Sequence, residues 1–382
     1  MSSQPEKCDV LILSVEAGTG HAQAARALAD ALAERGLVSR IEDAFAYGPP
    51  WVFDTVIGVY LRLLEQAPSL YSYLYGLAEG PSAGRLGQRI LTTYLKIFLG
   101  QGLRDLIRQR EPRCIICTHP FPVGVLGYFR EEGWLQGPIA GVVTDFSIHP
   151  FWAFEGVDRY YVAATPLVDQ LRTFGIDPKT VQVTGIPIKE DFLRAAPMSR
   201  TEAEKALNIP ASPKRILVMG GGLGLGPVAE WVSDLTRAPL EDLQIVVVAG
   251  KNEELEQRLR QIPAPPERLI VLGYTRQVAL LMACSDLFIT KPGGLSASEA
   301  MAMALPQILL PPLPGQEEVN LRFLVDHQAA WPAEDGDKFI EQVTVLLQDE
   351  QRLSACREAA RRLGNLLAAR KVADDIENII NR

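Results

Sequence analysis

Short, almost continuously apolar runs alternate along most of this chain with longer stretches in which apolar residues recur at helical spacing. Runs that are apolar throughout are typical of strands in parallel sheets, because helices cover both faces of such sheets. The pattern therefore predicts an α/β protein with two Rossmann-like parallel sheets. The expected strands are residues 10–14, 39–43, 114–117, 139–143, 160–163 and 181–184 for the first sheet, and 215–219, 244–249, 269–272, 287–289 and 307–310 for the second.

A polar stretch separates the two groups of strands. It spans residues 189–214 and carries prolines at positions 197, 210 and 213. With 382 residues, the chain has a length for which two domains are expected. We therefore expect one domain over residues 1–190 and a second over residues 200–365, joined by this stretch.

The alternation is interrupted between residues 44 and 103, where no clear strand is found and aromatic and basic residues are interspersed. A helical surface that combines Tyr and Trp with Arg and Lys suits a membrane interface. The same composition also fits an ordinary helical insertion packed against the sheet, and the residues alone leave both interpretations open. The residues concerned are Trp51, Phe53, Tyr60, Tyr71, Tyr73, Tyr75, Tyr94 and Phe98, with Arg62, Arg85, Arg89, Lys96 and Arg104.

Composition and charge argue against several classes of function. The net charge of −8 disfavours nucleic acid as a partner, and no apolar run is long enough to span a membrane. The N-terminus lacks the pattern of a signal peptide, and five cysteines suit a reducing cytosol. Cys114 and Cys117 form a C-x-x-C pair, but no second pair exists to complete a zinc site, which favours a plain core strand.

Three glycine-rich turns follow expected strands and precede expected helices, at residues 18–21, 220–224 and 292–294. Glycine lets a ligand approach the backbone, and the following helix offers its N–H groups and the positive end of its dipole to an anion. The first turn lacks the third glycine of a dinucleotide-binding fingerprint, since Gln23 stands there, which disfavours a nicotinamide cofactor. The second lacks the Lys-Ser/Thr pair of a P-loop, which disfavours NTP hydrolysis.

The most informative stretch is residues 289–320. Its glycine turn suits phosphate, and Glu299 lies about one and a half turns into the next helix, where its carboxylate could accept hydrogen bonds from ribose. Gln316 and Glu317 stand at the start of a further helix, where they could bracket the hydroxyls of a sugar. One segment thus offers sites for phosphate, ribose and hexose in that order, which indicates a nucleotide-sugar site.

His21 closes the first glycine turn. A lone histidine at a helix start is often a cap or packing residue, but its place after a strand and two glycines favours a general base. His119 and Asp145 follow other expected strands, and the carboxyl ends of parallel strands meet at one edge of a sheet. A metal site built from His119, Asp145 and His149 is an alternative, and Asp145 could also simply cap its turn.

In their order along the chain, these motifs resemble those of glycosyltransferase family 28, and in particular of its diacylglycerol glucosyltransferases and monogalactosyldiacylglycerol synthases. The resemblance covers nearly the whole chain. It implies the GT-B fold, in which two Rossmann-like domains face a cleft and a C-terminal helix, here residues 368–382, packs back onto the first domain. The motifs are GTGHAQAA (18–25), TDFSIHPFWAFEGVDRYYVA (144–163), TGIPIK (184–189), VLGY (271–274) and the segment 289–320.

The resemblance implies an inverting transferase that moves a hexose from UDP-glucose or UDP-galactose to the hydroxyl of diacylglycerol. Residues 1–190 would hold the lipid acceptor, with the insertion 44–103 against an anionic membrane surface, and residues 200–365 would hold the donor. His21 would be the general base, with Asp145 as its partner or substitute. The family implies no metal and no other cofactor, and a cytoplasmic protein attached peripherally to the membrane.

The resemblance also assigns binding residues to the two substrates. For the donor these are Gly220, Gly221, Gly222, Gly273, Tyr274, Gly293, Gly294, Ser296, Glu299, Gln316, Glu317 and Asn320. For the acceptor they are Gly18, Gly20, His119, Phe146, His149 and Trp152. Two alternatives remain: another family 28 enzyme that adds N-acetylglucosamine to the lipid-linked peptidoglycan precursor, and a non-catalytic sensor that binds a UDP-sugar.

Overall fold

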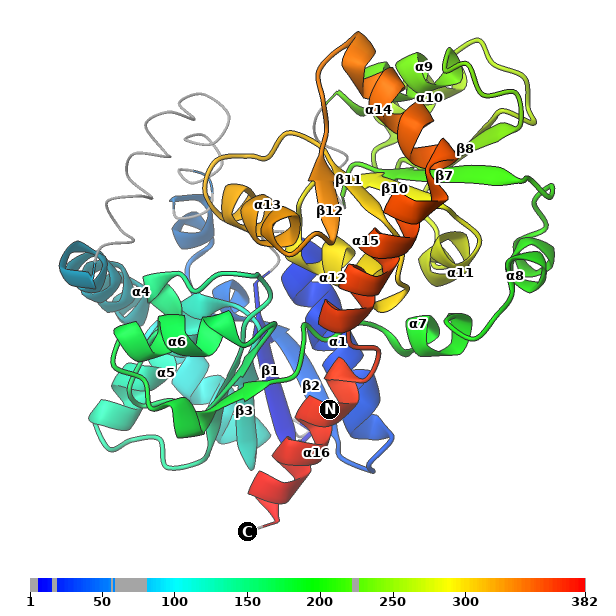
Figure 1. Cartoon of the computed structure of the whole chain (residues 1–382). Helices are drawn as coiled ribbons and strands as arrows, with labels where there is room; N and C mark the ends of the chain where they lie inside the picture. Colours follow the sequence, from blue (N-terminus) through cyan, green and yellow to red (C-terminus); the bar gives the residue numbers. More distant parts are fainter. Residues whose placement is uncertain (1–5, 16–18, 56–57, 59–80, 222–226, 382) are drawn as a thin grey trace. The chain divides into compact units, whose positions relative to one another are not determined.

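The chain forms two compact units, each built on one sheet of six parallel strands. This confirms the predicted α/β fold with two parallel sheets. The computed structural model describes residues 6–15, 19–55, 58, 81–221 and 227–381 (Figure 1). The first unit consists of Met1–Lys189, Leu313–Gln316 and Leu367–Arg382, and the second of Glu190–Pro312 and Glu317–Leu366.

The first sheet has the strand order β2-β1-β3-β4-β5-β6. Its strands are β1 Val10–Ser14, β2 Ser39–Asp43, β3 Cys114–Cys117, β4 Ile139–Val142, β5 Arg159–Val162 and β6 Val181–Val183. The helices of this unit are α1 Thr19–Ala33, η1 Ala44–Tyr47, α4 Pro81–Arg110, α5 Pro120–Glu131, η2 Pro150–Trp152, α6 Pro166–Thr173, η3 Pro178–Thr180 and α16 Ala368–Ile380. The described part of the insertion is helical. Of the helices that the structure describes, none combines the length and apolarity that a bilayer span requires.

The last helix, α16, packs against α1 (Figure 1). Leu28 and Leu32 of α1 and Val372 and Ile376 of α16 are fully buried in one apolar cluster with β1. A spacing of four residues places each pair on one face of its helix. Burial of each such side chain stabilises the fold by about 1.5–3 kcal/mol. The end of the chain is therefore part of the core of the first unit.

Cys114 and Cys117 both lie in β3 with buried side chains. Burial raises the pKa of Cys114 to about 12 and raises the pKa of Cys117 as well. Both thiols therefore stay protonated near neutral pH, a state that suits neither metal binding nor thiol exchange. Cys114 belongs to the same apolar cluster as α1 and α16.

The second sheet has the strand order β12-β11-β10-β7-β8-β9. Its strands are β7 Lys214–Met219, β8 Leu243–Val248, β9 Leu269–Leu272, β10 Leu287–Thr290, β11 Gln307–Leu309 and β12 Ala330–Pro332. The sequence pattern missed β12, because three residues ending in proline give no periodicity. The helices are α7 Glu190–Ala195, α8 Arg200–Leu207, α9 Val228–Thr236, α10 Glu253–Arg260, α11 Val278–Ala283, α12 Gly294–Ala302, α13 Gln316–Asp326, α14 Asp337–Gln348 and α15 Glu350–Leu363.

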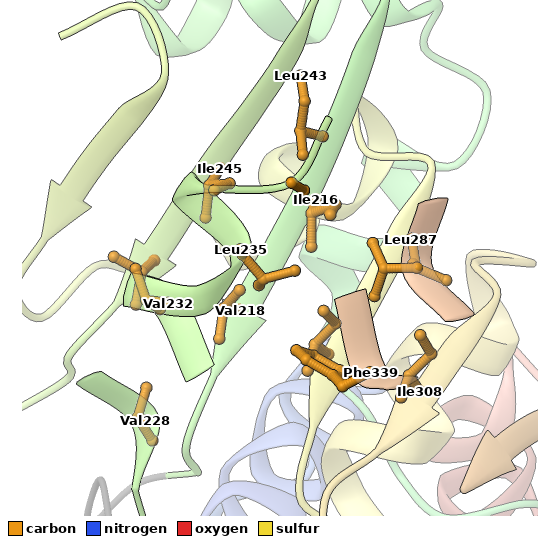
Figure 2. Packing of buried hydrophobic residues seen from close by; sticks show 14 of the residues in the cluster. Ile216, Val218, Val228, Val232, Leu235, Leu243, Ile245, Leu287, Ile308 and Phe339 are labelled. Atoms are coloured by element: carbon orange, nitrogen blue, oxygen red, sulfur yellow. The ribbon is translucent and has the colours of Figure 1, made fainter. Parts of the chain in front are cut away.

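One apolar cluster of the second unit lies on one face of this sheet, where branched side chains of the strands meet α9 and α14 (Figure 2). Ile216, Val218 and Ile245 point from β7 and β8 toward Leu235 of α9, and Phe339 of α14 closes the cluster. All five side chains are buried. This packing fixes the strand ends from which the glycine turns of the unit emerge.

The expected linker is fixed to the second unit from residue 190 onward. Arg215 of β7 is fully buried, and its guanidinium donates to Glu204 of α8 at 2.9 Å and to Gln244 of β8 at 2.7 Å. Arg200 donates two hydrogen bonds to the carboxylate of Asp286 at 2.9 and 3.0 Å. A buried charge is costly unless it is paired, so these contacts hold α8 against the sheet.

Candidate functional site

The carboxyl ends of β1, β3 and β4 lie at one edge of the first sheet. Thr118 and His119 follow β3, and Thr144 and Asp145 follow β4 within two or three residues. His21 reaches the same edge from α1. This helix already begins at the second residue before His21, so the imidazole belongs to the first helical turn and not to the loop that the sequence suggested.

The hydrogen bonds of His21 determine which of its ring nitrogens carries the proton. Nδ1 lies 2.7 Å from the carbonyl oxygen of Thr118 and 2.8 Å from the hydroxyl of Thr144. Because a carbonyl oxygen can only accept, Nδ1 is the protonated nitrogen and donates to it. The Nε2 atom of the neutral ring then carries the lone pair, as a general base requires.

Burial lowers the pKa of His21, while the negative charge of Asp145 and the hydrogen bond to Thr118 act in the opposite direction. The imidazole is therefore neutral near pH 7. An opposing carboxylate also stabilises the imidazolium that forms when the ring accepts a proton. Both conditions favour His21 as a proton acceptor during a reaction.

His119 and His149 repeat one local motif, His-Pro-Phe, at the starts of α5 and η2. The Nδ1 of His119 accepts from the backbone N–H of Phe121 at 3.2 Å, and that of His149 accepts from Phe151 at 3.3 Å. Burial lowers the pKa of His149 to about 4. Burial and the neighbouring His21 together lower the pKa of His119 well below its usual value. Both rings are neutral with the proton on Nε2, opposite to His21.

Aromatic rings form a continuous series beside His21. The His119 ring lies 4.6 Å from that of His21 and 4.6 Å from that of Phe121. Phe121 in turn lies 6.1 Å from Phe45 and 6.2 Å from Phe151, measured between ring centroids. These separations are typical of favourable aromatic pairs. His21 thus stands next to an apolar wall of the same unit.

Tyr160 of β5 and Gln88 of α4 hold the loop around η2 by hydrogen bonds. Trp152 is fully buried, and its carbonyl oxygen accepts from the hydroxyl of Tyr160 at 2.6 Å. Buried Gln88 of α4 donates to two backbone carbonyls of the loop at 2.9 Å each. Phe146 is only 3% exposed. Trp152 and Phe146, both expected at the acceptor, therefore lie in the core and position the loop.

Asp145 is buried, and its Oδ2 accepts a hydrogen bond from Nε2 of Gln316 at 3.2 Å. Gln316 ends the segment Leu313–Gln316, which belongs to the first unit. The predicted sugar-binding amide and the predicted partner of His21 are thus in direct contact. Gly20 lies in the first turn of α1, whereas Gly18 lies outside the described residues.

The glycine turn after β10 has the geometry expected of an anion site. Gly293 is the N-cap of α12 and Gly294 its first residue, with no side chain capping the helix. The first N–H groups of a helix have no partner within it. Buried Asn320 donates from Nδ2 to the carbonyl oxygen of Pro292 at 3.1 Å. Asn320, expected among the donor-binding residues, therefore fixes the turn.

Ser296 and Glu299 lie three residues apart on α12, so they share one face of the helix. Both are partly exposed. Ser296 lies in the first turn, beside the glycines, and Glu299 lies in the next turn. This order along the helix matches the order of phosphate and ribose in a nucleotide.

The glycine turn after β7 lies against a lysine that the sequence analysis did not assign. Gly220 is buried, and Gly221 has φ +77°, a conformation that favours glycine. A Cβ at Gly221 would lie 2.5 Å from Cε of Lys291. The Nζ of Lys291 forms an ion pair with Oε1 of Glu317 at 2.7 Å. Two glycine turns, one ammonium group and one carboxylate therefore meet at the carboxyl edge of this sheet.

Gly273 and Tyr274 follow β9. A Cβ at Gly273 would lie 2.5 Å from Oε2 of Glu256, so only glycine fits without displacing that side chain. The ring of Tyr274 is 55% exposed, with Nζ of Lys251 6.0 Å from its centroid. An exposed ring of this kind can stack on a nucleobase. Gly222, also expected at the donor, lies outside the described residues.

Three residues that the sequence analysis missed stand out in these contacts. Thr118 and Thr144 hold the ring of His21, and Lys291 lies between two glycine turns. A signal for each was present, because Thr118 directly precedes His119, Thr144 precedes Asp145, and Lys291 precedes the Pro-Gly-Gly turn. Polar residues at the last positions of parallel strands mark a site even when no motif names them.

Comparison with solved structures shows the GT-B glycosyltransferase fold. MurG of Acinetobacter baumannii aligns with a TM-score of 0.59 at 17% identity, over 97% of this chain and 99% of the other. The glycotransferase of kitacinnamycin aligns with a TM-score of 0.62 at 16% identity, over 98% and 100%. At these identities the likeness establishes the fold alone.

The family follows from closer sequence comparisons. The monogalactosyldiacylglycerol synthase model matches residues 21–188, and the C-terminal domain model of glycosyltransferase family 28 matches residues 215–376. A processive diacylglycerol beta-glucosyltransferase of Bacillus pumilus (strain SAFR-032) is 34% identical over 96% of this chain and 94% of its own length. One of the same name from Bacillus subtilis (strain 168) is 32% identical over 96% and 94%. The chain belongs to glycosyltransferase family 28, together with these diacylglycerol glucosyltransferases.

Proposed function

We propose that this protein is an inverting hexosyltransferase that moves glucose or galactose from a UDP-sugar to the hydroxyl of diacylglycerol. The observation that carries the proposal is the geometry of His21, whose Nδ1–H is held by Thr118 so that Nε2 is the basic atom. The aromatic series beside this base suits an apolar acceptor. The names of the relatives, which are diacylglycerol glucosyltransferases, point to the same acceptor.

In the proposed step, the acceptor oxygen attacks the anomeric carbon and forms the new glycosidic bond. The bond between that carbon and the β-phosphate oxygen breaks, and its electron pair leaves with UDP. The hydroxyl proton passes to Nε2 of His21, and the charge of Asp145 stabilises the resulting imidazolium. A single displacement inverts the anomeric carbon. The proposed step uses no cofactor.

The donor is assigned to the second unit. The turn of Gly293 and Gly294 at the start of α12 and the turn of Gly220 and Gly221 would receive the diphosphate. Ser296 would add a hydroxyl donor beside the first of these turns. These groups are fixed before the ligand arrives, which makes them effective for a charge that grows during the reaction.

The remaining donor contacts concern ribose, uracil and hexose. Glu299 would accept hydrogen bonds from the ribose hydroxyls, and Gly273 with the exposed ring of Tyr274 would hold the uracil. Gln316 and Glu317, at the start of α13, would bind the hexose hydroxyls. The contact between Gln316 and Asp145 would place the sugar-binding amide next to the partner of the base.

A membrane surface is the proposed partner of α4. Ile90 and Ile97 are 64% and 67% exposed, and their spacing of seven residues places them on one face of the helix. Trp51 is 48% exposed and lies 4.8 Å from the ring of Phe98. Large exposed apolar side chains beside aromatic rings suit a lipid interface. We therefore propose peripheral attachment of the first unit to the membrane at its cytoplasmic face.

The structure changes the expected electrostatics of this surface. Lys96 and Arg104 both form ion pairs with Glu132 of the segment that follows α5, and Lys96 also lies 5.1 Å from the ring centroid of Tyr128. One carboxylate thus holds both cations, and the three groups together keep one net positive charge. Arg89 is exposed on α4. The side chain of Arg85 lies outside the described residues.

The test of the proposed function is a product analysis with three donors offered together, namely UDP-glucose, UDP-galactose and UDP-N-acetylglucosamine. With diacylglycerol in mixed micelles, we expect hexosyl-diacylglycerol and UDP release that depends on the lipid. Transfer only of N-acetylglucosamine, to a lipid-linked peptidoglycan precursor, would replace the proposal by another activity of the family. Binding of UDP-sugar without any product would indicate a sensor.

A further inference from the structure

Lys291 lies between the two glycine turns to which the diphosphate of the donor is assigned. Its aliphatic stem lies against Gly221, and its own chain continues directly into the turn of Gly293 and Gly294. The Nζ atom lies 2.7 Å from Glu317 and is partly exposed, with 28% of the side-chain surface accessible. The lysine is therefore bound on one side by a glycine turn and on the other by a carboxylate.

We propose that Lys291 is the cation that binds the diphosphate of the nucleotide, and that Glu317 competes with the diphosphate for it. This inference rests on the proposed function of the second unit. Before the diphosphate binds, the ion pair with Glu317 would hold the ammonium group in place. When the diphosphate binds, the ammonium turns to the phosphate oxygens and the Glu317 carboxylate exchanges it for the hexose hydroxyls.

Three physical points support this exchange. An ammonium group is a compact charge with three donors on a flexible stem, so it can change partners without moving the backbone. A diphosphate carries more negative charge than one carboxylate, so it is the stronger partner at short range. The absence of a side chain at Gly221 leaves room for the lysine stem.

The exchange also explains how Glu317, next to Gln316 at the start of α13, can lie near a phosphate-binding turn. A carboxylate near a diphosphate would repel it unless a cation lies between them. Lys291 supplies that cation, so that a sugar-binding carboxylate and a phosphate-binding turn can share one edge of the sheet. Binding of the nucleotide part would then prepare the hexose part of the site, which couples the two halves of the donor.

The test compares affinities for UDP, UMP and uridine by calorimetry in the full-length protein. Lys291→Met keeps the length of the stem and removes the charge, and we expect it to weaken UDP binding about 10- to 100-fold. UMP should lose less, and uridine should bind as before. Lys291→Arg should recover part of the UDP affinity. Lys338→Met, at an exposed position of α14 in the same unit, removes one charge elsewhere and serves as the matched control.

Glu317→Gln distinguishes the exchange from a structural ion pair. We expect this variant to bind UDP several-fold more tightly, because the competing charge is gone, and to turn over UDP-hexose more slowly. A structural ion pair would instead give parallel losses in the two variants, together with a lower melting temperature. Unchanged UDP binding in Lys291→Met, with the wild-type chain binding UDP, would overturn this inference alone. Failure of the wild-type chain to bind UDP would overturn the proposed function.

Discussion

The carboxyl edges of the two sheets present different chemical groups. In the first unit, side chains define the edge, because His21, His119 and Asp145 follow or face strand ends and most of their contacts are to side chains and rings. In the second unit the backbone defines it, through glycine turns at Gly221 and Gly293 that open toward helix starts. The same parallel architecture thus presents side chains at one carboxyl edge and backbone groups at the other.

The difference follows from what each substrate would require. A proton acceptor must be a side chain with a suitable pKa, and in the first unit the proposed acceptor is a neutral imidazole buried against a carbonyl oxygen. An anion is bound well by N–H groups and a helix dipole, for which large side chains would only be in the way. Changes at the first edge should therefore affect catalysis with little effect on nucleotide affinity, and changes at the second edge should do the reverse.

The largest expected effect is that of His21→Ala. Loss of the general base should lower kcat with diacylglycerol about 10²- to 10⁴-fold. UDP affinity should be unchanged, because the residues proposed to bind the UDP part of the donor lie in the second unit. Steady-state assays of UDP release and calorimetry with UDP measure the two quantities. His327→Ala, at the residue that directly follows α13, is the control. Substantial residual transfer in His21→Ala would assign the base to another group, with Asp145 the first to test.

Glu299→Ala tests the proposed ribose site at the carboxyl edge of the second sheet. Loss of a charged acceptor for the ribose should weaken UDP binding by about 1.5–3 kcal/mol, or roughly 10- to 150-fold in Kd. At saturating donor, kcat should change much less. Calorimetry with UDP measures the effect, with Glu341→Ala on exposed α14 as the control. An unaltered Kd would place the ribose away from α12.

Asp145→Asn should have a smaller effect that depends on pH. The negative charge of Asp145 raises the pKa of His21, so its removal should lower that pKa further. The acid limb of kcat/KM against pH, which lies below the ordinary histidine value of 6.5, should move to lower pH. The plateau should fall several-fold because the base is weaker.

The pH profile of Asp145→Asn has an internal control. Gln316→Ala removes a hydrogen bond to Asp145 but leaves its charge, so the acid limb should stay in place even if turnover falls. An acid limb that remains fixed in Asp145→Asn would mean that the limb does not report His21. Complete loss of activity in this variant would instead favour the carboxylate as the base.

The smallest expected effect concerns the membrane surface of the first unit. Arg89→Ser should weaken binding to anionic liposomes by about 1 kcal/mol, or roughly fivefold. Lys96→Ser should change binding less, because its ammonium group is already held in an ion pair with Glu132. Co-sedimentation at low salt measures both. Equal losses in the two variants would mean that the ion pair opens at the membrane, and no sedimentation of the wild-type protein would contradict the membrane proposal.

Local sequence determined the elements of this protein. Buried strands of parallel sheets are apolar along their whole length, so eleven of the twelve strands that the structure describes could be located from the sequence to within one residue at each end. The glycine turns, Glu299 and the histidines could be singled out for the same reason, since they stand directly at strand ends or helix starts. Such signals are local, because backbone geometry is set by neighbouring residues.

Only the tertiary structure decided what these residues do to one another. Thr118 and Thr144 lie 97 and 123 positions from His21, yet both contact its Nδ1, and the carbonyl oxygen of Thr118 places the proton on that nitrogen. Glu132 lies 36 positions from Lys96 and compensates its charge. Lys291 and Glu317 are 26 positions apart, on different elements. Hydrogen bonds and ion pairs of this kind depend on distances of a few ångströms between side chains, which exist only once the sheets have assembled and which no periodicity along the chain encodes.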